Sequence, residues 1–185
     1  MNQETLINFF NKYIKDTPEK AVVLDQKMFL CRLTVAVQKG IGLSESIRGV
    51  YVTLRCIKHL FDKKPAEEFM FLLGNLHKVV KHPNKIYENK NSKRGGYCFV
   101  KRIGDAEYFC SIGVVKIPTT VFGEAVFGVS KFGAEKEVEE IQVATAFRLR
   151  DHKYLKNYTF LLDWGNGNPH RSALDTPKES TNAPQ

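Results

Sequence analysis

The residues of this 185-residue chain that could do chemistry are hydroxyl, imidazole and cationic side chains in its second half. RNA can be cleaved without a metal when its 2′-hydroxyl attacks the adjacent phosphorus. One group must accept the proton, another must protonate the leaving oxygen, and cations must stabilise the charge on phosphorus. Side chains of these types lie near the ends of expected strands: His82, Lys93, Arg94, Thr145, Arg148, His152 and Tyr154. Along a strand, Thr145 and Phe147 point to one side, and Arg148 points to the other unless a bulge intervenes.

Positive charge is concentrated in one segment, residues 78–102, which we call the basic segment. The chain has a net charge of +8 and a sequence pI of about 9.3. The basic segment contains a single acid, Glu88, and the following cations: Lys78, Lys81, Lys85, Lys90, Lys93, Arg94, Lys101 and Arg102. Such local enrichment is typical of a surface that contacts phosphates.

Aromatic residues are interleaved with these cations, and aromatic faces can stack on unpaired bases. The residues expected to bind nucleic acid are Lys85, Tyr87, Lys90, Tyr97, Lys101 and Arg102. Two other interpretations use the same residues. The segment could be a solvated basic loop, or it could bind an acidic protein such as an inhibitor or immunity protein.

The element order indicates an α+β protein. Apolar spacing predicts four helices, at residues 2–15, 19–38, 43–61 and 65–80, and the many β-branched residues of 19–38 keep a strand open there. Alternation predicts a hairpin at 96–103 and 107–117, a long connection at 118–140, a strand at 141–150 and a short helix or last strand at 154–164. Three regions follow: a helical half (1–80), an antiparallel-sheet domain (81–164) and a disordered tail (165–185).

A family resemblance rests on several short stretches of the second half. "HPNKIYENKNSKRG" precedes the hairpin "YCFVKRIGDAEYFCSIGVV", and "VATAF" precedes "HKYLKNY". Over residues 76–164 this layout resembles the phage-associated ribonuclease toxins of the barnase/RelE-like class. The resemblance implies a helical part packed on a four-stranded antiparallel sheet, and RNA cleavage without a metal.

Together, the residues and the resemblance predict a toxin-like endoribonuclease of phage or mobile-element type that leaves a 2′,3′-cyclic phosphate. Lys93 and Arg94 would hold the phosphate, Thr145 and Arg148 would line the site, and a histidine would carry the proton. His82 and His152 are the two alternatives for that histidine, and no cofactor is expected. The other prediction is a non-enzymatic nucleic-acid-binding or adaptor protein that uses the same basic face.

Several classes of protein are disfavoured. The chain has no phosphate-binding glycine loop, no HExxH and no GxSxG. Its four cysteines form no CxxC pair, so we expect buried free thiols, and a Cys98–Cys110 disulfide only if the two face each other. We predict a cytoplasmic protein without a membrane partner, because the N-terminus is unlike a signal peptide and no apolar stretch is long enough to span a bilayer.

Overall fold

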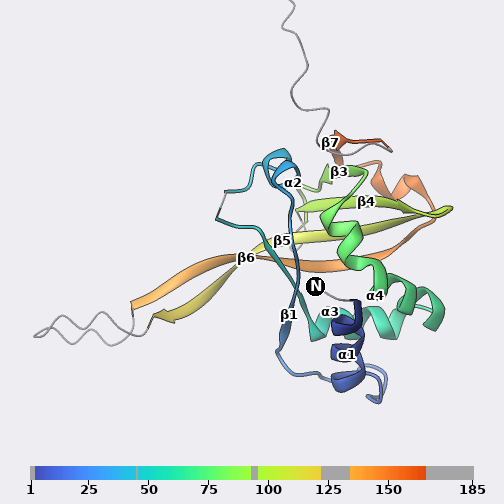
Figure 1. Ribbon diagram of the computed structural model, residues 1–185, viewed down its shortest axis with the longest axis vertical. Helices are drawn as coiled ribbons and strands as arrows, with labels where there is room; N and C mark the ends of the chain where they lie inside the picture. Colours follow the sequence, from blue (N-terminus) through green and yellow to red (C-terminus); the bar gives the residue numbers. More distant parts are fainter. Residues whose placement is uncertain (1–2, 45, 93–95, 122–133, 166–185) are drawn as a thin grey trace, which may run out of the picture.

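The computed structural model describes residues 3–44, 46–92, 96–121 and 134–165 (Figure 1). Four helices, seven strands and one 3₁₀ helix follow one another along this part of the chain. They are α1 (Gln3–Tyr13), β1 (Lys27–Arg32), α2 (Val35–Gly40), β2 (Gly49–Thr53), α3 (Leu54–Lys63), α4 (Ala66–Lys81), β3 (Lys85–Glu88), β4 (Tyr97–Ile103), β5 (Ala106–Val121), β6 (Ala134–Leu149), η1 (His152–Leu155) and β7 (Thr159–Asp163).

All seven strands form one mixed sheet in the order β1-β2-β6-β5-β4-β3-β7. Neighbouring strands are antiparallel except for β2 and β6, which run parallel with Val50 opposite Ile141. The prediction of a helical N-terminal half followed by a four-stranded antiparallel sheet is therefore wrong. Two of the seven strands come from the N-terminal half, and one of them pairs with a strand formed about 90 residues later.

The expected helices at 19–38 and 43–61 are replaced by strand–helix pairs, and a threonine caps the start of the helix in each pair. Thr53 ends β2, and its hydroxyl oxygen accepts a hydrogen bond from the Cys56 backbone N–H at 3.1 Å, which caps α3. Thr34 follows β1 and caps α2 in the same way through the Val37 N–H. Pairing between β1 and β2 thus overrides the helical apolar spacing of these stretches.

Other predictions of local structure are confirmed. Helices α1 and α4 form at the expected positions, and β4 and β5 form the expected hairpin. Gly104 turns this hairpin with a φ of 61°, a left-handed conformation that glycine adopts at no steric cost.

The expected long connection at 118–140 is different in the structure. Part of it is strand, because β5 continues to Val121 and β6 begins at Ala134.

Helices α1, α3 and α4 cover one face of the sheet and enclose the main core with it (Figure 1). Three phenylalanine rings join these helices, with centroids 5.1 Å apart for Phe10–Phe61, 4.9 Å for Phe10–Phe69 and 5.3 Å for Phe61–Phe69. Trp164 is buried in the same cluster. On the opposite face, which we call the open face, the described residues form a small second cluster beneath η1.

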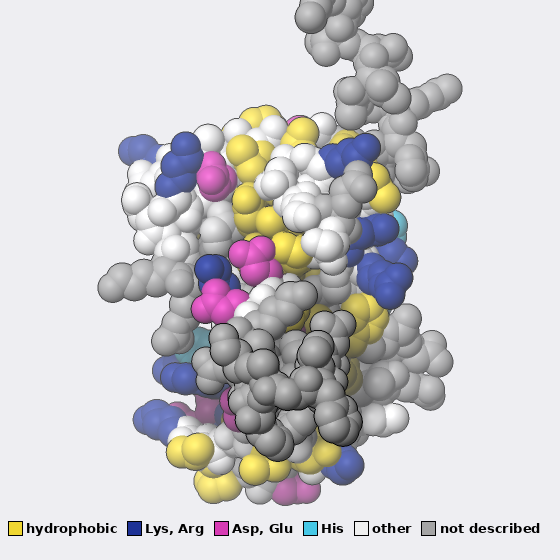
Figure 2. Space-filling view, turned by 90° about the vertical axis from the view of Figure 1, so that its left-hand side faces the viewer, with side chains coloured by type: hydrophobic (Ala, Val, Ile, Leu, Met, Phe, Trp, Pro, Cys, Tyr) yellow, Lys and Arg dark blue, Asp and Glu magenta, His cyan; other side chains and the backbone are white. Residues whose placement is uncertain are grey.

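The far ends of β5 and β6 form a two-stranded ribbon that leaves the sheet. Strand β4 pairs with β5 only as far as Ile112, and β2 pairs with β6 only at Ile141 and Gln142. Beyond these points β5 and β6 pair with each other alone, and the ribbon projects to the left in Figure 1. Figure 2, which looks onto this side of the molecule, shows acidic side chains near the ribbon and basic side chains toward both sides.

All four cysteines are free and buried. Cys98 packs in the cluster on the open face, whereas Cys110 belongs to the core beneath the helices, so the two do not face each other. No helix in the described part of the chain is long and apolar enough to cross a membrane. The expected disordered tail, from residue 166 onward, lies outside the described residues.

Candidate functional site

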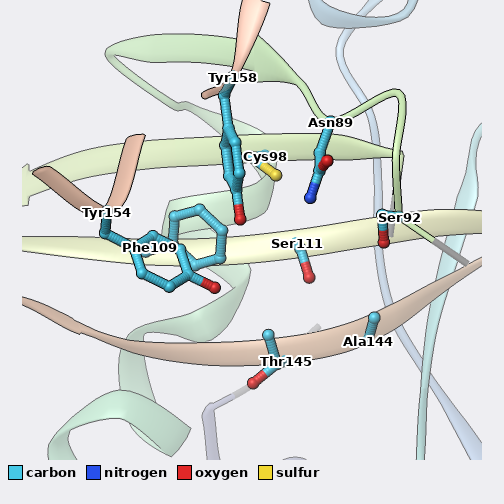
Figure 3. Close-up of a pocket in the computed structure, with 9 residues that line it drawn as sticks. All are labelled: Asn89, Ser92, Cys98, Phe109, Ser111, Ala144, Thr145, Tyr154 and Tyr158. Atoms are coloured by element: carbon cyan, nitrogen blue, oxygen red, sulfur yellow. The ribbon is translucent and has the colours of Figure 1, made fainter. Parts of the chain in front are cut away.

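A hollow of 210 Å³ opens on the centre of the open face, and we call it the hydroxyl hollow. Strands β4, β5 and β6 form its floor, while η1, the residues after it and the segment after β3 form its walls (Figure 3). Its lining consists of Asn89, Ser92, Cys98, Phe109, Ser111, Ala144, Thr145, Tyr154 and Tyr158. Five of the nine carry a hydroxyl group, and one carries an amide.

The strand register places the two small hydroxyls of the floor side by side. Ser111 of β5 lies opposite Thr145 of β6, and both belong to the open face. Immediately beyond this pair the register shifts, because Ile112 lies opposite Val143 and Ala144 has no direct partner. This bulge places the consecutive residues Ala144 and Thr145 together in the floor of the hollow, which regular alternation would not do.

Aromatic rings form the wall of the hydroxyl hollow on the side of η1. The Phe109 ring centroid lies 5.3 Å from that of Tyr154, and the Tyr154 centroid lies 5.7 Å from that of Tyr158. Phe147 stacks on Phe109 at 4.7 Å and supports it from the neighbouring strand. Because Tyr154 is about half exposed, its ring offers a face on which an unpaired base could stack.

The chemical character of the hydroxyl hollow is that of a set of neutral hydrogen-bond donors. The pKa of Tyr158 is raised, first by burial and then by its hydrogen bond with Tyr154, while the hydrogen bond from Asn89 acts in the opposite direction. Figure 3 shows the Tyr158 hydroxyl and the Asn89 amide pointing toward each other. Tyr158 therefore remains protonated at neutral pH and can donate to an anionic oxygen.

Of the six residues predicted to be catalytic, only Thr145 lines the hydroxyl hollow. Lys93 and Arg94 lie outside the described residues. His82 is an exposed residue at the end of α4, and its pKa is lowered by partial burial and by the charges of Lys81 and Lys101. Arg148 lies opposite Tyr108, which belongs to the core beneath the helices, so its side chain leaves β6 on the side away from Thr145.

His152 lies instead in a separate hollow, together with Arg102 and Arg148. Its Nε2 atom is 2.9 Å from Oε2 of Glu107. This pairing orients the imidazole toward the end of the β4–β5 hairpin and away from Ser111 and Thr145. Neither histidine alternative is therefore brought to the hydroxyl hollow by the described structure.

The residues predicted to bind nucleic acid are divided between the two faces of the sheet. Tyr87 lies on the open face, with its ring 5.5 Å from that of Phe160. Tyr97 packs instead against the core beneath the helices, and burial lowers the pKa of Lys101. The remaining three are exposed or half-exposed: Lys85 lies 4.0 Å from Asp163, Lys90 lies 3.8 Å from Glu88, and Arg102 lines the separate hollow.

Four residues of the hydroxyl hollow had no place in the sequence prediction: Asn89, Ser92, Ser111 and Tyr158. One signal could have identified Ser111, because it is the one serine or threonine in the mainly apolar stretch "YFCSIGVV" and points to the same side of the strand as Phe109. Among the described residues, no group of three His, Cys, Asp or Glu side chains is arranged to hold a metal ion.

The thiols provide a test of burial at the sheet. Burial raises the pKa of Cys31, Cys56 and Cys98 to about 12, and that of Cys110 well above its usual value. In the unfolded chain thiols ionise near pH 8.5, so the folded state holds more protons above that pH and stability must fall as the pH rises. We expect the free energy of unfolding to fall by up to about 1.4 kcal/mol per thiol per pH unit between pH 9 and 10.5.

Urea unfolding across this pH range measures the effect. Cys98→Ala should give a shallower dependence than the native chain, because it removes one of the titrating groups. An equal slope, or rapid reaction of the native thiols with Ellman's reagent at pH 8, would contradict the burial of these four cysteines.

Comparison with known proteins finds no match: no family model, no curated protein and no solved structure is significantly similar to this chain.

Proposed function

We propose that the protein is a metal-independent endoribonuclease that holds the scissile phosphate of a single-stranded RNA over the hydroxyl hollow. The observation that carries this proposal is the convergence of Ser111, Thr145 and Tyr158, with the Asn89 amide, in one open hollow beside aromatic rings. Neutral donors held in fixed positions can stabilise the charge that develops on phosphate oxygens. An adjacent aromatic face suits a splayed base of an unpaired RNA.

The reaction is an internal transfer within the RNA. The 2′-oxygen forms a bond to phosphorus while the bond from phosphorus to the 5′-oxygen breaks, which leaves a 2′,3′-cyclic phosphate and a 5′-hydroxyl. The net change moves one proton from the 2′-hydroxyl to the leaving 5′-oxygen. Tyr158 and Ser111 would donate hydrogen bonds to the phosphate oxygens. Thr145, beside Ser111, would contact the phosphate on the side opposite Tyr158.

Positive charge for this step would come from the basic segment. Lys93 and Arg94 follow Ser92 directly in the sequence, and Ser92 lines the hydroxyl hollow. Guanidinium and ammonium groups both bind phosphate, and Arg does so with a planar pair of donors.

The test is cleavage of a labelled single-stranded RNA in the presence of EDTA. We expect products that end in a 2′,3′-cyclic phosphate, and loss of cleavage in Lys93→Ala/Arg94→Ala and in Thr145→Val. Thr159→Val, which changes an exposed threonine of β7, is the matched control and should cleave normally. If the wild-type protein at micromolar concentration leaves the RNA intact, the proposed ribonuclease activity is wrong.

A second candidate is RNA binding without cleavage. It is favoured by one observation: none of the nine residues that line the hydroxyl hollow carries a charge at neutral pH. In that case the wild-type protein would retard the same RNA on a gel without cutting it, and Lys93→Ala/Arg94→Ala would abolish the retardation.

A further inference from the structure

Two aromatic rings lie side by side on the open face at the outer edge of the sheet, and we call them the aromatic platform. They are Tyr87 of β3 and Phe160 of β7, which are direct partners in the register of these two strands. Their ring centroids are 5.5 Å apart and the ring planes meet at 70°, an edge-to-face contact. Phe160 is 53% exposed, so its ring stays accessible while Tyr87 supports it.

The strand register places the aromatic platform on the same face as the hydroxyl hollow. Tyr87 is the direct partner of Cys98 on β4, and Cys98 lines the hollow. Phe160 follows one strand further out, because β7 is the neighbour of β3. Neighbouring strands are about 4.8 Å apart, so Phe160 lies about 10 Å from Cys98 across the sheet.

Two segments of the chain connect the aromatic platform with the hydroxyl hollow. Asn89 and Tyr158 line the hollow. Tyr87 precedes Asn89 by two residues, and Phe160 follows Tyr158 by two residues. Two residues of chain span at most about 7 Å. The platform and the hollow are therefore parts of one continuous surface that is wide enough for more than one nucleotide.

Charge does not favour a phosphate at the aromatic platform. Lys85 lies 4.0 Å from Asp163, and Lys90 lies 3.8 Å from Glu88. These two pairs contribute no net charge beside the rings. A ligand that binds at the platform must therefore do so through a flat, uncharged surface. A nucleobase offers such a surface, because every base has a π-face that can stack on an aromatic ring.

We propose that Phe160, supported by Tyr87, stacks on a base of the RNA strand next to the nucleotide held in the hydroxyl hollow. This inference rests on the proposed function and adds a second base subsite to it. Aromatic side chains on the open face of a sheet stack two or three bases of single-stranded RNA in this way. The substrate is then an unpaired stretch of at least two nucleotides, because a base inside a duplex is already stacked on its neighbours.

The experiment is a binding measurement that does not depend on cleavage. A fluorescein-labelled 2′-O-methyl RNA of twelve nucleotides cannot undergo 2′-hydroxyl attack, and its anisotropy reports affinity. We expect Phe160→Ala to bind this RNA about tenfold more weakly than the wild type, the effect of losing one stacked base. The slope of log affinity against log salt should stay the same, because no phosphate contact is lost. An abasic chain of twelve sugar phosphates should bind equally to both proteins.

Three further variants separate stacking from packing. Phe160→Trp keeps an aromatic face and should bind the RNA as the wild type does. Phe160→Leu keeps apolar area without that face and should lose about as much affinity as Phe160→Ala. Phe71→Ala is the matched control and should leave the affinity unchanged. Phe71 of α4 is 43% exposed, and its ring lies 5.2 Å from that of Tyr108, which belongs to the core beneath the helices.

The failures of the two proposals are distinguishable. Equal affinity of the wild type and Phe160→Ala for the RNA would overturn this inference and leave the proposed function standing. Wild-type affinity in Phe160→Leu would also overturn it, because apolar contact would then suffice. A wild-type dimer that becomes a monomer in Phe160→Ala would assign the ring to a contact between copies of the chain, with the same consequence. No binding of the RNA by the wild type would overturn both proposals.

Discussion

Tyr158→Phe is expected to slow RNA cleavage by about 10²–10³-fold while changing the affinity for RNA by less than about twofold. The substitution removes one hydroxyl and keeps the ring that packs beside Tyr154. A donor already aimed into the hydroxyl hollow stabilises charge as it develops on phosphorus, and it contributes little to binding of the ground state. The loss should therefore appear in kcat and leave KM nearly unchanged.

Tyr51→Phe is the matched control for this experiment. Tyr51 lies in β2, its ring packs against Phe29, and it lines neither hollow. The control should cleave at the wild-type rate. An unchanged cleavage rate in Tyr158→Phe would mean that the Tyr158 hydroxyl takes no part in the reaction. A rise in KM with kcat unchanged would instead make it a group that only binds RNA.

The second large effect concerns stability. Phe69→Ala should lower the free energy of unfolding by about 3–5 kcal/mol, because Phe69 is 1% exposed and sits between Phe10 and Phe61. Its removal leaves a cavity where α1, α3 and α4 meet. Urea unfolding measures the change, and Met70→Ala, one residue further along α4 and 39% exposed, should cost less than about 1 kcal/mol.

This measurement also tests whether the two halves of the chain unfold together. The same core contains Phe69 of α4 and Trp164 beyond β7, so helical circular dichroism and tryptophan fluorescence should shift to lower urea by the same amount. Separate transitions would mean that the helical part and the sheet are independent units. A loss below about 1 kcal/mol would contradict the packing around Phe69.

The sequence predicted elements well wherever local signals and tertiary packing agree. Helix α4 has Pro65 before its first turn, acids in that turn and a continuous apolar face, and it forms as expected. The hairpin of β4 and β5 has clear alternation and a glycine turn. In these cases short-range chemistry alone specifies the structure.

The prediction from sequence failed where residues far apart in the chain decide the structure. The stretch "KMFLCR" has no β-branched residue, yet it forms β1 because it pairs with "GVYVT" of β2, which in turn pairs with β6. The hydroxyl hollow was only partly foreseen for the same reason. Thr145 belonged to a recognisable strand, but its approach to Asn89 and Tyr158 depends on sheet order and on a bulge that no local pattern records.

The parallel pairing of β2 with β6 has a consequence for how the chain is made. When Val50 leaves the ribosome, its partner Ile141 has not been synthesised, and at 5–20 residues per second it follows roughly 5–18 seconds later. During that interval the backbone edge and the apolar side chains of β2 that pair and pack with β6 in the folded chain have no partner from β6. We therefore expect the nascent chain to be prone to aggregation at this stage, so that its yield depends on translation speed and on chaperones that hold exposed strands.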